Sequence, residues 1–459
     1  MPSDVICGAD PLVRGRRPRR PVSLDANPPW AFDSYSAAAV LIGLATPWQI
    51  EWLGILYASE ILLAVVAFWA LLTQFTNTRF WQRPFATLLA CLGATVLAYV
   101  VADLTLGTEL QNLARGWARN IFLGSNFIGL YFLSRRNPFN LMIYAISAAA
   151  GTLGYLAFTG ALFDDWKFGA SAPLTLLVAC LVPLVASRGS PAGALALAAI
   201  GLLHIELNSR EIGGNCLLAG VLLLSRCPSV RRWQSRSWVV LGILMSTGVG
   251  VLLYAYVLTD AEYARHREFS NAWRTASLIT AATAISDSPW MGYGSQANNF
   301  NLQSRYDSIF AEHTGIRYRG QRTDTSTFSP HSQILQAWFE AGIFGAVFFL
   351  YLGWKLARGF GWCIFLRPPD AFSVLFAFCL LRATWHLLFS PFAGLARLDV
   401  ALAAAIVCLL DRERRHEHRA KWGLASASLI ERIPTLPTPS PWTQLPVPVS
   451  PLDHPRHSK

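Results

Sequence analysis

The sequence predicts an all-α membrane protein that crosses the bilayer many times. Of its 459 residues, 53% are hydrophobic and only 14% are charged, and the mean hydropathy is +0.36. A soluble protein usually carries about 25% charged residues. The hydrophobic residues also come in long blocks, and a bilayer-spanning helix needs about 20 of them. The soluble classes are therefore excluded, and we expect about twelve transmembrane helices.

The expected spans follow one another along the chain and are separated by short polar gaps. They lie near residues 34–47, 53–73, 85–103, 119–133, 139–158, 171–187, 191–206, 212–225, 237–257, 332–354, 371–390 and 398–410. Every second gap is basic, as with Arg135 and Arg136 or Arg231 and Arg232. Because Lys and Arg accumulate in cytoplasmic loops, this alternation predicts an even number of spans with both termini in the cytoplasm. The net charge of +11 thus reflects topology, and no nucleic-acid partner is expected.

The spans divide the chain into five expected segments. They are a basic cytoplasmic N-terminus (1–33), nine helices (34–257), one large and partly helical periplasmic loop (258–331), three further helices (332–410) and a cytoplasmic tail (411–459). The tail is first basic and then rich in proline, a composition typical of disorder. No A-x-A-like cleavage site follows the first hydrophobic block convincingly, so that block is expected to remain as an anchor.

The large loop is unusual because it is rich in arginine. Its arginines are Arg265, Arg267, Arg274, Arg305, Arg317, Arg319 and Arg322. Long outward domains escape the rule for basic loops, so the topology still holds. Two interpretations remain open for this charge. It forms either a solvated, lipid-contacting surface or a pocket for phosphate, which guanidinium groups bind in a bidentate manner. Apolar residues at helical spacing also predict a helix over 263–285.

His331 stands where this loop meets the tenth span. Ser329 and Pro330 are favoured at the cap and at the first position of a helix, which would place His331 in the first helical turn. The helix dipole there attracts anions and disfavours an imidazolium. A neutral histidine is what a general base requires. The alternative is an interfacial histidine that only caps the helix.

Residues on both sides of His331 form an ordered pattern. It consists of Arg274, Pro289-x-x-Gly-Tyr-Gly294, Pro330-His331-Ser-x-x-Leu-Gln and Glu340-x-Gly342-x-x-Gly345, with Ser209-Arg210 after an earlier span. The pattern resembles the O-antigen ligase and polymerase superfamily of bacterial inner-membrane proteins. The family commonly has asparagine after the histidine, where this chain has Ser332.

The resemblance implies a GT-C-like, metal-independent membrane glycosyltransferase that needs no cofactor. Its donor would be a glycan on undecaprenyl pyrophosphate. Its acceptor would be lipid A-core for a ligase or another lipid-linked glycan for a polymerase. His331 would be catalytic, and Arg274 and Arg210 would hold the pyrophosphate, whose developing charge fixed guanidinium groups stabilise. Further substrate contacts are expected from Arg265, Arg267, Gly292, Gly294, Arg319, Ser332 and Glu340.

Charged residues inside the spans invite a functional interpretation as well. Arg382 and His386 lie four residues apart, on one face of the eleventh span. They either line a cavity beneath the lipid headgroup or form structural pairs with Glu60, Asp103 or Asp399. The sequence leaves this choice open.

Metal and redox sites receive little support from the sequence. His204-Ile-Glu206 resembles a fragment of a metal site, but two ligands are a weak signal. The eight cysteines include no C-x-x-C pair, so neither a disulfide framework nor a zinc site is indicated. Arg115 and Arg119 flank an outward gap, where a helper role toward the lipid phosphate is conceivable.

Two other classes of function compete with the glycosyltransferase. A transporter or flippase would explain many spans and buried charge, but it predicts repeated halves and a site at the bilayer midplane. This chain concentrates its chemically useful residues in one outward loop, which favours an enzyme. An assembly protein would use the same loop as a docking surface for partners. The resemblance to the ligase and polymerase superfamily implies a location in the bacterial inner membrane.

Overall fold

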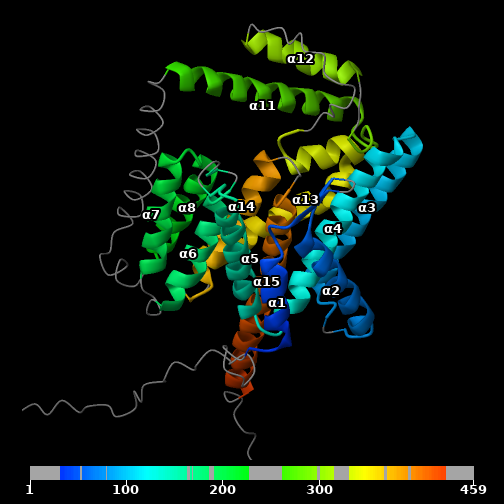
Figure 1. Cartoon of the computed structure of the whole chain (residues 1–459). Coiled ribbons are helices and arrows are strands. Elements are labelled where there is room, and N and C mark those ends of the chain that lie inside the picture. Colours follow the sequence, from blue (N-terminus) through cyan, green and yellow to red (C-terminus); the bar gives the residue numbers. More distant parts are fainter. Residues whose placement is uncertain are drawn as a thin grey trace, which may run out of the picture. The chain divides into compact units, whose positions relative to one another are not determined.

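The protein is mostly helical. The computed structural model describes residues 32–51, 54–78, 80–162, 166–167, 169–185, 191–226, 261–296, 300–314, 330–365, 370–390 and 394–430. The helices are α1 (Ser34–Leu44), α2 (Ala58–Gln74), α3 (Arg83–Leu106), α4 (Leu110–Ser134), α5 (Phe139–Phe158), α6 (Ser171–Val185), α7 (Ala192–Glu206), α8 (Arg210–Leu224), α11 (Ala261–Asp287), α12 (Phe300–Thr314), α13 (Gln333–Phe365), α14 (Ser373–Phe389) and α15 (Ala396–Ile430) (Figure 1). A small antiparallel hairpin joins β1 (Gln49–Glu51) to β2 (Ile55–Tyr57).

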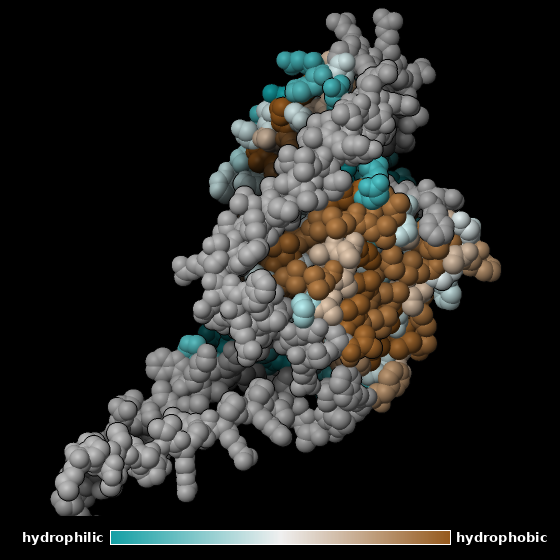
Figure 2. Space-filling model, turned by 90° about the vertical axis from the view of Figure 1, so that its left-hand side faces the viewer, coloured by the Kyte–Doolittle hydropathy of each residue, from teal (hydrophilic) through white to brown (hydrophobic). Residues whose placement is uncertain are grey.

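Each predicted span that the structure describes overlaps a helix, although α4, α13 and α15 extend beyond the predicted bounds. The predicted ninth span, 237–257, lies outside the described residues. Helices α3, α5 and α13 are long and apolar enough to cross a membrane, and α1, α2, α6, α7 and α14 are shorter apolar helices. Figure 2 shows a broad hydrophobic face that would suit a lipid environment. A helical membrane protein is thereby confirmed, whereas the number of spans and the GT-C-like arrangement stay predictions.

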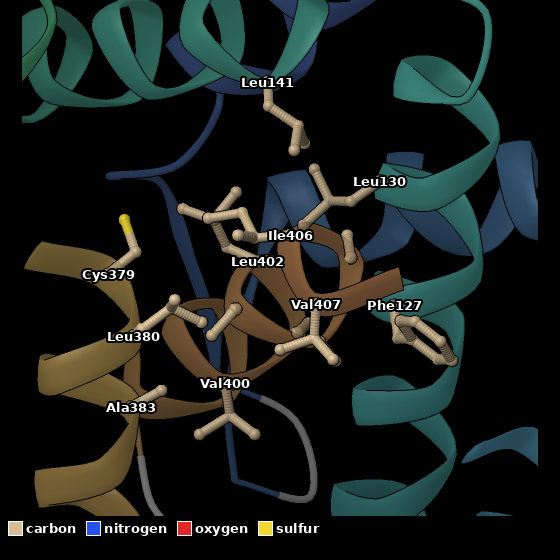
Figure 3. Close-up of a cluster of buried hydrophobic side chains, with 14 of the residues drawn as sticks. Phe127, Leu130, Leu141, Cys379, Leu380, Ala383, Val400, Leu402, Ile406 and Val407 are labelled. Carbon is tan, nitrogen blue, oxygen red and sulfur yellow. The ribbon is translucent and has the colours of Figure 1, made fainter. Parts of the chain in front are cut away.

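Helix α15 forms the centre of the packed helices. Every residue from 400 to 410 is buried, as expected for a helix that is apolar all round. Leu402, Ile406 and Val407 of α15 belong to one hydrophobic cluster with Leu130 of α4 and Leu380 of α14 (Figure 3). Two compact units divide the chain, one ending at Leu410 and the other beginning at Asp411.

The charges on α14 and α15 pair with each other. Arg382 Nε donates to Asp399 Oδ2 at 2.9 Å, and His386 Nε2 lies 3.2 Å from the same oxygen. A charge in an apolar environment is costly unless it is paired. The predicted pairing of Arg382 and His386 with Asp399 is therefore confirmed. Arg382 and Asp399 also line a cavity, so a functional role beneath the lipid headgroup stays an open alternative.

A second buried ion pair was not predicted. Arg397 donates to both carboxylate oxygens of Glu60, at 2.8 and 2.7 Å, and Asn126 donates to Glu60 at 3.0 Å. Glu60 is fully buried. This pair joins α2 to the start of α15, helices that lie far apart in the sequence.

Two predicted elements differ in the structure, and one helix was not predicted. The tenth span is not one regular helix, because α13 is broken at Ala341 and Gly342 and continues to Phe365. The start of the tail is helical, since α15 extends from the last span to Ile430. Helix α12 was not predicted, although Leu302, Tyr306 and Phe310 recur at intervals of four residues and form its buried face. The proline-rich part of the tail, for which disorder was predicted, lies outside the described residues.

Candidate functional site

Helices α11 and α12 form a hairpin that contacts the first part of α13. The helix predicted over 263–285 is confirmed as α11. Small residues of α11 pack against large residues of α12, and Phe339 of α13 belongs to the same cluster. Its buried members are Ala272, Ala276, Ala281, Ala284, Leu302, Tyr306, Phe310 and Phe339. The alanines allow the two helices, green in Figure 1, to approach closely. The hairpin thus has a small core of its own, which positions α11 relative to α13.

Ser332, and not Ser329, caps the helix that follows the loop. Helix α13 begins at Gln333, and Ser332 Oγ accepts the amide of Leu335 at 3.3 Å. Ser329 lies outside the described residues. The Ser332 hydroxyl also donates to the carbonyl of Leu387 in α14 at 3.0 Å. The prediction that His331 occupies the first turn is therefore wrong. His331 directly precedes the helix and is held by its neighbour, Ser332.

His331 and Arg274 are brought together by this arrangement. His331 is half-buried, and its Nδ1 is buried without a hydrogen-bond partner among the described residues. Burial lowers the pKa of His331 below its ordinary value, and the positive charge of Arg274 lowers it further. Arg274 is exposed on α11. A neutral imidazole near a cation is a combination that suits proton abstraction next to an anion.

The break in α13 is created by a loop that inserts into the helix. We call residues 289–296 the glycine loop. Gly342 has φ 65° and ψ −170°, a conformation that is essentially restricted to glycine. A side-chain Cβ at this position would overlap the backbone carbonyl of Trp290 in the glycine loop. Position 342 therefore requires glycine, because of its backbone conformation and its contact with the Trp290 carbonyl.

Hydrogen bonds from the glycine loop replace those that the broken helix loses. The amide of Tyr293 donates to the Phe339 carbonyl at 2.9 Å, and the amide of Gly294 donates to the Glu340 carbonyl at 2.9 Å. In a continuous helix these two carbonyls would accept amides from the next turn. The amide of Ile343 in turn donates to the carbonyl of Pro289 at 2.9 Å. The loop and the helix thus form one interlocked unit.

The two glycines of the loop lie against protein segments. Gly292 has φ 72°, and a Cβ there would lie 2.6 Å from the carbonyl carbon and oxygen of Glu340. Gly294 has φ 82°, and a Cβ there would lie 2.5 Å from the hydroxyl of Thr108. Both positions therefore need glycine for conformation and for space. Substrate contact by Gly292 and Gly294 stays a prediction.

Glu340 lies at the centre of this interlocked unit. Its side chain is fully buried and accepts hydrogen bonds from Tyr99 Oη at 2.7 Å and from Arg119, with which it forms an ion pair. It also accepts the amide of Gln296 at 3.2 Å and Gln336 Nε2 at 3.2 Å. The carboxylate therefore joins α3, α4, α13 and the glycine loop. Contact between Glu340 and the substrate stays a prediction.

Asp103 anchors the other end of the glycine loop. Its carboxylate accepts the backbone amide of Ser295 at 2.6 Å and the Ser295 hydroxyl at 2.7 Å. Trp117 Nε1 donates to the same side chain at 2.8 Å. Asp103 is buried, so these bonds replace the hydration that it loses. Two buried carboxylates, Glu340 and Asp103, thus fix the loop to the transmembrane helices.

The sequence interpretation missed the groups that bind the two buried carboxylates: Tyr99 and Arg119 bind Glu340, and Trp117 binds Asp103. For Arg119 it considered only a helper role toward the lipid phosphate. Tyr99, Asp103, Arg119 and Trp117 come from α3 and α4, far from His331 in the chain. The available signal was the presence of Asp103 and Arg119 inside or beside apolar spans. Such residues usually have a buried partner or a function. The carboxylate of Glu340 could then have been recognised as a partner for the charge of Arg119.

Arg210 is the first residue of α8. Ser209 before it is almost completely buried, and its hydroxyl donates to Ser171 Oγ at 3.2 Å. The first amides of a helix have no partner within the helix and attract anions. Arg210 is therefore placed at a helix end that favours negative charge, where Glu211 already supplies one carboxylate, and its role toward pyrophosphate stays a prediction.

The structure does not describe the side chains of three other arginines for which substrate contact was predicted. Arg265 and Arg267 lie on α11, but the structure does not describe their side chains. Arg319 lies outside the described residues. Their substrate contacts stay predictions, as does that of Ser332.

The described residues include no cluster of three or more potential metal ligands. His204 is hydrogen-bonded instead: Trp166 Nε1 donates to its Nδ1 at 3.0 Å, and its Nε2 lies 2.7 Å from Thr175 Oγ1. The two ring nitrogens are therefore occupied by protein groups. The weak resemblance of His204-Ile-Glu206 to a metal site has a structural explanation.

Part of the chain matches a known protein family. Residues 173–350 match the family described as O-antigen ligase. The matched range contains Arg210, Arg274, the glycine loop and His331. No curated protein matches the chain.

Proposed function

We propose that the chain, whose residues 173–350 match the O-antigen ligase family, transfers a glycan from undecaprenyl pyrophosphate to an acceptor. The reaction takes place at the periplasmic face of a bacterial inner membrane. The acceptor is lipid A-core or another surface glycan. The observation that carries the proposal is the half-buried His331 just before α13, whose pKa is lowered by burial and by the positive charge of Arg274.

The proposed reaction is a substitution at the anomeric carbon of the donor. The acceptor hydroxyl loses its proton to His331 as its oxygen bonds to the anomeric carbon. The bond between that carbon and the pyrophosphate oxygen breaks, and the electron pair leaves with undecaprenyl pyrophosphate. A histidine with a lowered pKa is neutral at pH 7 and can accept this proton.

Arg274 and Arg210 are proposed to stabilise the leaving group. Negative charge grows on the pyrophosphate as the glycosidic bond breaks. Fixed guanidinium groups stabilise this charge without having to reorganise during the reaction. Arg274 has a second effect, because its charge helps to keep His331 neutral.

We propose that Glu340, Gly292 and Gly294 act by positioning. Glu340 is fully buried and binds groups of α3, α4, α13 and the glycine loop, and a Cβ at Gly292 or Gly294 would meet Glu340 or Thr108. They hold the break in α13, and the first part of this helix directly follows His331. A role in orienting His331 fits their burial better than direct contact with a sugar.

The lowered pKa of His331 predicts the pH dependence of the transfer. The base is active when neutral, so activity is present above its pKa and is lost as the pH falls through it. We expect the acid limb of kcat/KM to have its midpoint below the ordinary histidine pKa of about 6.5. Arg274→Gln should raise the pKa of His331, measured by NMR titration of the imidazole, because it removes a charge that disfavours imidazolium. A wild-type midpoint above 6.5 would contradict this role for His331.

The phenotype of a deletion strain tests the proposed function and distinguishes a ligase from a polymerase. Loss of a ligase should leave a finished polymer on undecaprenyl pyrophosphate, with acceptor that carries no polymer. Loss of a polymerase should leave products that carry a single repeat unit. Analysis of the lipid-linked glycans and of the surface polysaccharide distinguishes these outcomes. Unchanged glycans in both fractions would argue against either activity.

A further inference from the structure

We propose that His204 is a positioning residue that fixes Arg210 and thereby sets the affinity for the donor pyrophosphate. This inference rests on the proposed function of Arg210. His204 lies in the last turn of α7, six residues before Arg210, and its side chain is fully buried. The proposed reaction does not otherwise use it.

The backbone turn between α7 and α8 connects the two residues. Asn208 has φ 62°, a left-handed conformation that asparagine tolerates better than most residues. Its amide donates to the Ile205 carbonyl at 3.1 Å, and the amide of Ser209 donates to the His204 carbonyl at 2.7 Å. These bonds form a Schellman motif, which ends α7 sharply. Helix α8 can therefore begin immediately at Arg210.

The ring of His204 is held in one tautomer. The indole N–H of Trp166 can only donate, so His204 Nδ1 must accept this bond of 3.0 Å. The neutral ring then carries its proton on Nε2, which donates to Thr175 Oγ1 at 2.7 Å. The Thr175 hydroxyl donates onward to the Ser171 carbonyl at 2.9 Å. Each bond in this series has a defined direction, and the series fixes the end of α7 to α6.

Ser209 provides a second attachment to the same residue of α6. Its hydroxyl donates to Ser171 Oγ at 3.2 Å, and the Ser171 hydroxyl donates to the Lys167 carbonyl at 3.0 Å. Helices α7 and α8 also approach closely, because a Cβ at Gly213 would lie 2.7 Å from the Gly201 carbonyl. The backbone of Arg210 is thus fixed from two sides, through His204 and through Ser209.

Loss of the imidazole should release this turn. His204→Leu leaves the Trp166 indole and the Thr175 hydroxyl without their buried partner, which is costly. The turn can then shift to satisfy these groups, and Arg210 shifts with it. Electrostatic stabilisation depends on fixed geometry. We expect His204→Leu to weaken binding about tenfold, which corresponds to roughly 1.4 kcal/mol.

The test measures binding of undecaprenyl pyrophosphate to the full-length protein in lipid nanodiscs. Arg210→Ala should weaken binding, and His204→Leu should weaken it by about tenfold. The double variant should bind no more weakly than Arg210→Ala alone, because both changes act through the same guanidinium. His204→Gln should retain most of the affinity, since its amide can accept from Trp166 and donate to Thr175. Trp166→Phe is a milder variant and should cause a smaller loss.

The controls separate the possible failures. Ser36→Ala removes a buried hydrogen bond of 2.8 Å to Asn140 between α1 and α5, and it should leave binding unchanged. Unchanged binding in His204→Leu, or additive losses in the double variant, would overturn the role of His204. Equal losses in His204→Leu and Ser36→Ala would do the same, because they would indicate general destabilisation. Unchanged binding in Arg210→Ala would instead overturn the proposed role of Arg210.

Discussion

His331→Ala and Arg274→Ala are expected to abolish glycan transfer while protein level and membrane insertion stay normal. Loss of a general base costs about 10²-fold to 10⁴-fold in rate. Loss of Arg274 removes a charge that stabilises the departing pyrophosphate and that lowers the pKa of His331. Neither side chain forms an ion pair with a carboxylate within the described part of the chain. The fold should therefore tolerate both changes.

Two residues of the same types provide matched controls on the α11–α12 hairpin. His313 is an exposed residue of α12 whose Nδ1 lies 2.9 Å from the Ile309 carbonyl. Arg305 is half exposed and lies 3.9 Å from Asp287. His313→Ala and Arg305→Ala should leave surface polysaccharide normal in a complementation assay. Normal polysaccharide in the His331 and Arg274 variants would contradict the assignment of the site.

Gly342→Val is expected to destroy the interlocked unit and with it both folding and activity. The substituted Cβ would overlap the Trp290 carbonyl, and the backbone conformation is one that only glycine adopts readily. Strain and overlap together should cost about 3 kcal/mol or more. The expected result is a low protein level and a lower melting temperature in detergent, with no transfer.

Gly361 is a matched control within the same helix. A Cβ at Gly361 meets no atom within 4 Å, and alanine is favoured over glycine in a helix. Gly361→Ala should therefore keep or slightly raise the melting temperature. A Gly342→Val protein that folds and transfers glycan normally would show that the break in α13 is dispensable.

The sequence predicted the parts of the fold that depend on local composition. Hydropathy located the helices, and helical spacing located α11. The sequence pattern around His331 also predicted that Arg274 belongs to its site, and the structure places the charge of Arg274 close enough to affect the imidazole. Hydropathy, helical spacing and sequence motifs are properties of the sequence itself, so they can be recognised without knowledge of tertiary contacts.

The break in α13 could not be predicted in this way. The apolar run continues through Ala341 and Gly342, and glycine is common in membrane helices. The break exists because carbonyls at 339 and 340 accept amides from the glycine loop, almost fifty residues earlier in the chain. This replacement of helix hydrogen bonds depends on a contact between distant segments, which local sequence patterns do not reveal.

The role of Glu340 was hidden for a similar reason. In the sequence it follows His331 closely, which suits a contact with substrate. In the structure its partners Tyr99 and Arg119 come from two earlier helices, 241 and 221 residues away. The helix cap was misplaced because Ser329 and Ser332 are both acceptable caps by composition. Only the bond from the Leu335 amide decides for Ser332.

The most direct test of the central claim is glycan transfer by the purified protein in proteoliposomes. Lipid-linked glycan donor and candidate acceptors, lipid A-core or a second lipid-linked glycan, are supplied, and both the joined product and free undecaprenyl pyrophosphate are measured. The wild-type protein and His313→Ala should form both products in equal amounts, whereas His331→Ala should form neither. Equal product formation by His331→Ala and the wild-type protein would contradict the catalytic role of His331.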